Sequence, residues 1–220
     1  MLRWAKANPS ATQHCGGQTI CKQSRMNSAT IMALIAGYLL GSIPFGLLLT
    51  RLGGKGDIRE VGSGNIGATN VLRTGSKSLA AATLLLDAAK GAVAVLLAQQ
   101  LWPDAVNFAA AGALIGHLYP AWLRFKGGKG VATMLGILVP LFWQAALVYA
   151  VIWVGLLLVL RISSVAGITA AASAPVTAAI LNEQALFPML LGFALLVIWK
   201  HRENIRRLAR GEEPRVGRTG

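Results

Sequence analysis

Val131–Leu160, VATMLGILVPLFWQAALVYAVIWVGLLLVL, is a run of 30 residues without a charged side chain. As one α-helix at about 1.5 Å per residue it would measure about 45 Å, too long for an upright crossing of about 30 Å of hydrocarbon. Pro140 and the pair Trp143-Gln144 lie near its centre. We therefore expect two short membrane spans that meet near these residues.

The rest of the chain is similarly apolar, with 55% hydrophobic and 13% charged residues among 220. Further charge-free runs cover residues 26–50, 105–123 and 162–182. Each approaches or exceeds the ~20 residues that a membrane-spanning helix needs. These runs lack amphipathic alternation and predict an all-α polytopic membrane protein, with loops too short for a separate soluble domain.

The connectors differ in their content of basic residues. Residues 51–77 contain five, 124–129 contain three and the tail from Lys200 contains seven, whereas 102–107 and 182–184 contain none. The positive-inside rule places the basic connectors in the cytoplasm, so an even number of spans must separate them. This predicts seven transmembrane helices, with the N-terminus outside and the C-terminus cytoplasmic. A five-span chain, in which residues 165–199 cross once, is the alternative. The expected spans are Ile31–Thr50, Ser78–Leu101, Val106–Trp122, the two halves of Val131–Leu160, Val165–Leu181 and Leu186–Trp199.

The first 25 residues differ from the rest. They are polar and free of acids, lack the apolar stretch of a signal peptide, and contain both cysteines, Cys15 and Cys21. Met26 begins a sequence that reads like a natural protein start. We expect residues 1–25 to be a disordered extension or a misassigned start, and residues 26–220 to form a single transmembrane domain.

Three polar segments fall on the predicted cytoplasmic side: residues 62–73, 116–133 and 201–213. Glycine N–H groups and lysines can surround a phosphate, and a helix that begins after the first segment adds partial positive charge. Each segment alone also fits turn residues, lipid-headgroup anchors or a basic stop after the last span. Together on one side, they predict a single anion site at the membrane surface.

Several other chemistries do not fit. Lys126-Gly-Gly-Lys-Gly130 lacks the spacing of a Walker A loop, and no histidine is followed by an aspartate five positions on. The net charge of +13 lies in loops that flank the spans, so no nucleic-acid partner is expected. Only eight acids are present and metal-ligand clusters are absent, so no metal or cofactor is expected. Cations and amide donors suit two phosphorylated substrates and an already activated electrophile.

The three segments resemble the three motifs of the bacterial acyl-phosphate–glycerol-3-phosphate acyltransferases, the PlsY family. The matching residues are Gly62-Ser-Gly-Asn-x-Gly-x-Thr-Asn-x-x-Arg73, Gly116-His-x-x-Pro with Phe125-Lys-Gly-Gly-Lys-Gly-Val-Ala-Thr133, and His201-Arg-x-Asn-Ile-x-Arg-Leu-x-x-Gly-x-Glu213. The similarity extends from about Met26 to the end of the chain, and Tyr119 stands where phenylalanine is common in the family.

The resemblance implies an enzyme of phospholipid synthesis. It would transfer an acyl group from acyl phosphate to the 1-hydroxyl of sn-glycerol 3-phosphate without a metal, giving 1-acylglycerol 3-phosphate (lysophosphatidate) and phosphate. It implies a seven-helix protein of the bacterial inner membrane whose active site faces the cytoplasm. Its partners would be the two substrates, membrane lipid and the enzyme that produces acyl phosphate.

The same resemblance implies the site residues. Arg73 and Lys129 would clamp phosphates, and Ser63 with the amides of the first motif would hold the acyl phosphate and the developing oxyanion. Glu213 is expected to be structural. The residues expected to be catalytic are Ser63, Arg73, Lys129, His201 and Asn204. The residues expected to bind substrate are Gly62, Gly64, Asn65, Gly67, Thr69, Asn70, His117, Lys126, Gly127, Gly128 and Gly130.

Some assignments stay open at the level of sequence. The proton acceptor is either His201 or a substrate phosphate, and His117 is either a site residue or part of an interfacial aromatic belt. Asp87 and Lys90 lie three residues apart within a span, where a neutralising structural pair is favoured over a proton or substrate relay. Lys126 shares the work of Lys129 or anchors its loop to headgroups. An organophosphate transporter and a lipid-binding scaffold are the alternative functions.

Overall fold

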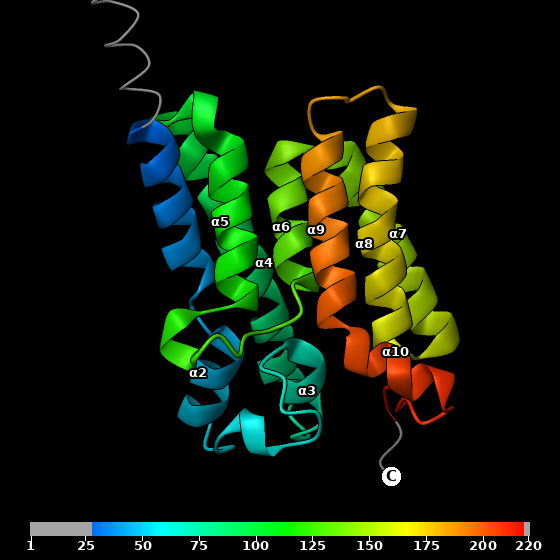
Figure 1. Cartoon of the computed structure of the whole chain (residues 1–220). Coiled ribbons are helices and arrows are strands. Elements are labelled where there is room, and N and C mark those ends of the chain that lie inside the picture. The colour runs from blue at the N-terminus through cyan, green and yellow to red at the C-terminus, as the bar shows by residue number, and fades with distance from the viewer. Residues whose placement is uncertain (1–27, 218–220) are drawn as a thin grey trace, which may run out of the picture.

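Helices make up the regular secondary structure of residues 28–217, the part of the chain that this computed structural model describes (Figure 1). The expectation for residues 1–25 lies outside the described residues. Residues 28–41 form the first helix. It is followed by α2 (Phe45–Leu52), α3 (Ala68–Leu72), α4 (Lys77–Leu101), α5 (Val106–Leu118), α6 (Val131–Leu141), α7 (Trp143–Leu160), α8 (Ser163–Ile180), α9 (Phe187–Lys200) and α10 (Arg202–Ala209), with 3-10 turns at Ile58–Glu60, Pro103–Ala105 and Ala121–Leu123.

Four segments in this part of the chain are long and apolar enough to cross a membrane. They are Ser28–Leu52, α4, α7 and α8, while α6 and α9 are apolar but shorter. The first of the four is not one regular helix, because residues 42–44 leave helical geometry before α2 begins. The expected span Ile31–Thr50 is therefore broken at residues 42–44.

The apolar run Val131–Leu160 folds as two helices, as its length predicted. Phe142 separates α6 from α7 with non-helical backbone angles, φ −157° and ψ 78°. Pro140 lies in the last turn of α6, where it has no N–H to bond the carbonyl of Gly136, so this turn is weakened just before the break. Residues 165–199 likewise form two helices, α8 and α9, so the single crossing considered as an alternative does not fit.

The first helix packs against α5 through glycines on both sides. Gly37 and Gly41 are four residues apart on one helix, and Gly112 and Gly116 repeat that spacing on the other. A Cβ at any of the four would overlap backbone atoms of the opposite helix. Small residues at this spacing let two backbones touch in a low-dielectric medium, where contact itself supplies much of the attraction.

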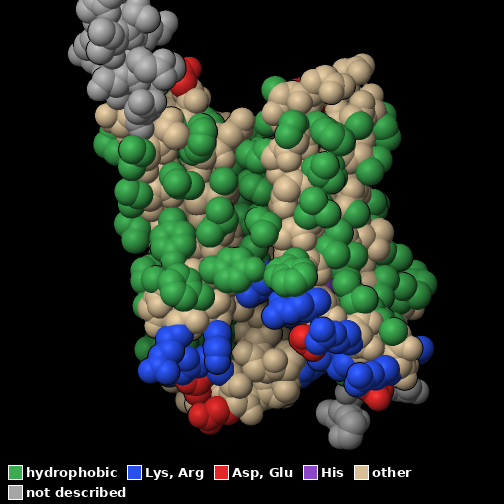
Figure 2. Space-filling model, in the orientation of Figure 1, with side chains coloured by type: hydrophobic (Ala, Val, Ile, Leu, Met, Phe, Trp, Pro, Cys, Tyr) green, Lys and Arg blue, Asp and Glu red, His purple; other side chains and the backbone are tan. Residues whose placement is uncertain are grey.

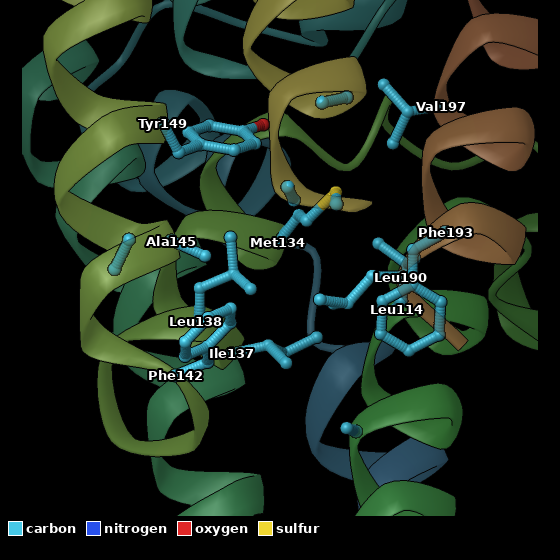
Figure 3. Close-up of a cluster of buried hydrophobic side chains, with 14 of the residues drawn as sticks. Leu114, Met134, Ile137, Leu138, Phe142, Ala145, Tyr149, Leu190, Phe193 and Val197 are labelled. Atoms are coloured by element: carbon cyan, nitrogen blue, oxygen red, sulfur yellow. The ribbon is translucent and has the colours of Figure 1, made fainter. Parts of the chain in front are cut away.

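A hydrophobic cluster joins all the helices from α4 to α9, and Figure 3 shows part of it. At one edge, the buried Tyr149 hydroxyl donates to the carbonyl oxygen of Val131 at 3.0 Å. The cluster thus fixes the first turn of α6, the helix that begins two residues after Lys129. Its labelled members in Figure 3 are Leu114, Met134, Ile137, Leu138, Phe142, Ala145, Tyr149, Leu190, Phe193 and Val197.

The three polar segments converge at one end of the helices. Figure 1 shows α3, the loop before α6 and α10 at the same end, remote from the turn between α8 and α9. On the face that Figure 2 presents, lysine and arginine side chains gather at this end, next to a band of hydrophobic side chains. This is the arrangement that the distribution of basic connectors predicted.

Candidate active site

A pocket at the basic end, with a volume of about 90 Å³, draws its lining from all three polar segments. The expected site residues that line it are Ser63, Asn65, Gly67, Thr69, Asn70, Arg73, His117, Lys129, Gly130, His201 and Asn204. Those expected residues that are not part of its lining are Gly62, Gly64, Lys126, Gly127 and Gly128. The pocket therefore unites residues of all three sequence segments, from Ser63 to Glu213.

One wall of the pocket is organised by Asn70, a buried residue of α3. Its Nδ2 donates to the carbonyl oxygens of Ile58 at 3.0 Å and Val61 at 2.8 Å. Its Oδ1 accepts from the backbone N–H of Ser63 at 3.2 Å and from Nη1 of Arg73 at 3.3 Å. One side chain thus ties the turn before α3 to the arginine that faces the pocket.

Glycines allow this turn to close. Gly62 and Gly64 have φ values of 55° and 67°, in the left-handed region that glycine adopts without strain. A Cβ at Gly62 would also crowd the side chains of Asn70 and Arg73. These two glycines allow the backbone of this wall to turn, but they are not part of the pocket lining.

A second wall of the pocket is formed by a chain of side-chain hydrogen bonds. Lys129 donates from Nζ to Oδ1 of Asn204 at 2.6 Å, and Asn204 donates from Nδ2 to Oε1 of Glu213 at 2.6 Å. Glu213 also accepts from Ser164 Oγ and from Arg207 Nε, each at 2.8 Å. Glu213 thus has the structural part expected of it, and it lines the pocket as well.

The charges of this wall depend on burial. Burial lowers the pKa of the Lys129 ammonium to about 8, although the Glu213 carboxylate acts in the opposite direction. Burial alone would raise the pKa of Glu213, but hydrogen bonds from Asn204, Ser164 and Arg207 bring it below its usual range. The wall therefore presents a cation beside an ionised carboxylate at neutral pH.

His201 is neutral in this environment. Burial lowers its pKa to about 4, despite the opposing hydrogen bond to Val197. Its Nδ1 lies 2.8 Å from the carbonyl oxygen of Val197. A carbonyl oxygen only accepts, so Nδ1 carries the proton and Nε2 is left as the unprotonated nitrogen.

The glycine pair before Lys129 contacts a histidine ring. The N–H groups of Gly127 and Gly128 donate to the carbonyl oxygens of Leu118 and His117, at 3.3 and 3.0 Å. A Cβ at Gly128 would overlap the imidazole of His117. The two glycines bring the loop against the end of α5, and their amides are engaged with backbone carbonyls.

Three further residues of the second segment differ in position. His117 is buried and lines the pocket, which does not fit an interfacial aromatic-belt residue. Gly130 has φ 87° and precedes α6. Lys126 is exposed and outside the pocket lining, which agrees better with a headgroup anchor than with a partner of Lys129.

The pocket also includes residues whose role the sequence did not indicate. Asp87 lines it and forms the expected ion pair with Lys90, at 2.7 Å. Ser164 lies three residues after Arg161, and this single base between two apolar runs could have indicated the pocket. Trp153 lies within an apolar run, where no such sign was present. The remaining lining residues are Leu84, Ala68, Val131, Ala132 and Ser163.

An apolar helix bundle with a cationic pocket at one end defines an integral membrane protein with a site suited to an anion. The family model described as glycerol-3-phosphate acyltransferase matches residues 31–211, most of the chain. This chain belongs to the glycerol-3-phosphate acyltransferase family, the PlsY family, as its motifs predicted.

Similar proteins agree with this membership. A glycerol-3-phosphate acyltransferase of Mesorhizobium japonicum is 54% identical over 195 residues, covering 89% of this chain and 100% of the relative. One of Brucella canis is 53% identical over 194 residues, covering 88% and 96%. The crystal structure of PlsY (YgiH), an integral membrane glycerol 3-phosphate acyltransferase in its glycerol 3-phosphate form, matches with a TM-score of 0.81. It is 39% identical, with 86% of this chain and 96% of that chain covered.

A second structure of PlsY, in its lysophosphatidic acid form, is 38% identical and matches with a TM-score of 0.78. It covers 86% of this chain and 95% of that chain. Together with the apolar helices, these likenesses make this chain an integral, multi-pass membrane protein.

Proposed function

We propose that this protein transfers an acyl group from acyl phosphate to the 1-hydroxyl of sn-glycerol 3-phosphate. The hydroxyl oxygen forms a bond to the acyl carbon, the bond from that carbon to the phosphate oxygen breaks, and the hydroxyl proton passes to the departing phosphate. The observation that carries the proposal is the meeting of Arg73 and Lys129 in one pocket, because two phosphorylated substrates require two cationic partners.

The two walls suit the two substrates. Lys129 and the first N–H groups of α6, which have no partner within the helix, would bind glycerol 3-phosphate. Arg73 and Ser63 would bind the acyl phosphate and the negative charge that develops on its carbonyl oxygen. The half-buried Leu84 and Trp153 would direct the acyl chain between the helices.

The departing phosphate is the better proton acceptor. His201, with a pKa of about 4, is a weak base near neutral pH. Glu213 is occupied by three donors, and Asp87 by Lys90. The pocket would then act by positioning the two substrates and by electrostatic stabilisation, without a metal ion.

The basic end of the bundle would face the cytoplasm of a bacterial inner membrane. Figure 2 supports this orientation, because lysine and arginine favour the cytoplasmic side. Seven spans, with the N-terminus outside and the C-terminus cytoplasmic, would agree with the ends at which α3 and α10 lie in Figure 1. Glycerol 3-phosphate would then enter from the cytoplasm.

An assay of the purified protein in lipid tests the proposal. It contains labelled glycerol 3-phosphate and either acyl phosphate or acyl-CoA as the donor. We expect product from acyl phosphate alone, at a rate that a chelator does not change. Arg73→Ala and Lys129→Ala should each lower the rate at least about a hundredfold, the effect of losing a strong charge-assisted hydrogen bond. The exposed Lys55 and Arg210 offer matched alanine controls that should retain activity.

Retained turnover in both pocket variants would remove the site assignment. Product from acyl-CoA alone would overturn the choice of donor. Uptake of label into proteoliposomes without chemical conversion would favour a transporter.

A further inference from the structure

A buried ionic cluster, two of whose members line the pocket, is not used by the proposed chemistry. Asp87 and Lys90 come from α4 and His117 from α5, and none of the three is more than 4% exposed. Lys90 Nζ lies 2.7 Å from Asp87 Oδ1 and donates to the carbonyl oxygen of Ile43 at 2.8 Å. Ile43 belongs to the break before α2, so the cluster connects three parts of the fold.

His117 is the third member of the cluster, but one of its ring nitrogens lacks a hydrogen bond. Its Nδ1 lies 3.7 Å from Asp87 Oδ1 and has no hydrogen-bond partner among residues 28–217. An unpaired buried polar atom is costly, and polar groups in such surroundings are usually satisfied. A shift of under 1 Å would turn this contact into a hydrogen bond from Nδ1–H to the carboxylate.

The other side of the same residue holds the loop that carries Lys129. The His117 carbonyl accepts from the N–H of Gly128, and the imidazole occupies the space in which a side chain at position 128 would lie. Gly128 directly precedes Lys129, whose ammonium donates to Asn204 at 2.6 Å. The orientation of the imidazole is thus one residue removed from a proposed phosphate-binding cation.

Filling this space with an ion pair costs free energy of folding. A buried pair must overcome the desolvation of both charges, and well-packed apolar residues often replace such a pair without loss of stability. A carboxylate beside a histidine, by contrast, selects the tautomer with the proton on the near nitrogen and fixes the ring plane. The cluster therefore offers orientation rather than stability.

We propose that Asp87 and His117 are positioning residues, which set the loop at Gly128 and thereby place Lys129 for the phosphate of the acceptor substrate. Lys90 holds the Asp87 carboxylate beside the ring through their 2.7 Å contact. This inference rests on the proposed function, because it deepens the description of the same site.

The test uses substitutions that keep volume. Asp87→Asn removes the charged acceptor of His117 but leaves Lys90 without its counter-charge. The double variant Asp87→Asn/Lys90→Met removes both charges, so it guards against a variant that fails to fold. His117→Gln removes the imidazole. Thr83→Val is the matched control, because Thr83 is buried on the same helix and its hydroxyl donates to the carbonyl oxygen of Leu79 in that helix, at 2.7 Å.

In the purified enzyme, the double variant and His117→Gln should each raise the KM for glycerol 3-phosphate about tenfold, the effect of losing one hydrogen bond. The KM for the acyl donor should stay within about twofold. The triple variant Asp87→Asn/Lys90→Met/His117→Gln should be no worse than either parent, because the residues act as one unit. An unchanged KM with only a lower melting temperature would overturn the inference, as would additive effects.

A second measurement does not depend on turnover. In protein with 15N-labelled histidine rings, the His117 signal, assigned through His117→Gln, should report the Nδ1–H tautomer and become mixed in the double variant. The same tautomer in both proteins would overturn the inference. The wild type could have the Nδ1–H tautomer and the double variant a mixture, while the wild type transfers no acyl group. In that case the proposed function fails, but the orientation of His117 by Asp87 stands.

Discussion

Asn70 and Asn204 line the same pocket and have the same task, but different groups hold their side chains. Each presents its amide oxygen to a cation, Arg73 or Lys129. Asn70 fixes its amide nitrogen on two backbone carbonyls, whereas Asn204 fixes its nitrogen on the carboxylate of Glu213. The first wall is therefore held by the shape of a turn, and the second by a chain of side chains that responds to charge and pH.

The largest effect should follow from breaking the first wall. Asn70→Asp removes the amide donor to the carbonyls of Ile58 and Val61, which keep backbone donors from Val61 and Gly64, and sets a carboxylate against both oxygens. Two lost hydrogen bonds at about 0.5–1.5 kcal/mol each, together with the carboxylate that faces two carbonyl oxygens, should cost about 3 kcal/mol or more and reduce the rate at least about a hundredfold. Thermal unfolding in detergent and initial rates measure both. A melting temperature equal to that of the wild type would show that the turn does not depend on Asn70.

Breaking the second wall should reduce activity with a smaller effect on stability. Asn204→Ala removes the acceptor of the Lys129 ammonium and one of the donors to Glu213, but no backbone group loses its partner. A hydrogen bond to a charged group contributes about 1.5–3 kcal/mol, so kcat/KM for glycerol 3-phosphate should fall roughly tenfold to a hundredfold. The melting temperature should change less than in Asn70→Asp. The reverse order would contradict the comparison of the two walls.

The charge of the second wall should appear in the pH profile. The pKa of Lys129 is about 8, so the cation is lost, and kcat/KM falls, as pH rises through this value. Glu213 raises the pKa of Lys129, so Glu213→Gln should move the alkaline limb to lower pH. Lys129→Arg is the control, because arginine stays charged and the limb should disappear. An alkaline limb that persists in Lys129→Arg would assign it to another group.

The smallest effect should come from one donor of three. Ser164→Ala removes the 2.8 Å hydrogen bond to Glu213, while Asn204 and Arg207 continue to donate. We expect a loss of about 1 kcal/mol in stability and a rate within about threefold of the wild type. Steady-state kinetics beside the wild type test this. A larger loss would mean that Glu213 depends on Ser164 alone.

Much of the fold follows from local patterns. The length of Val131–Leu160 and the position of Pro140 predict the break that the structure has at Phe142. The three polar segments predict the site, because groups of glycine, asparagine and lysine are unusual between apolar runs. These signals depend on residues close in sequence, so periodicity and composition detect them.

The contacts between distant helices could not be predicted in this way. Asp87 lies beside His117 because α4 and α5 pack together, and no pattern within either helix encodes that register. The engagement of Gly127 and Gly128 with the end of α5 was missed for the same reason, since a glycine that binds phosphate and one that accommodates a ring look alike in sequence.

The glycine contact between the first helix and α5 has a consequence for how the protein is made. The grooves of Gly37 and Gly41 remain unfilled until α5 has been synthesised. Tyr38, on the same helix, donates to the carbonyl of Tyr119, a residue 81 positions later. The first helix therefore cannot make this contact until α5 is present, so the lateral association of the pair must follow the synthesis of α5.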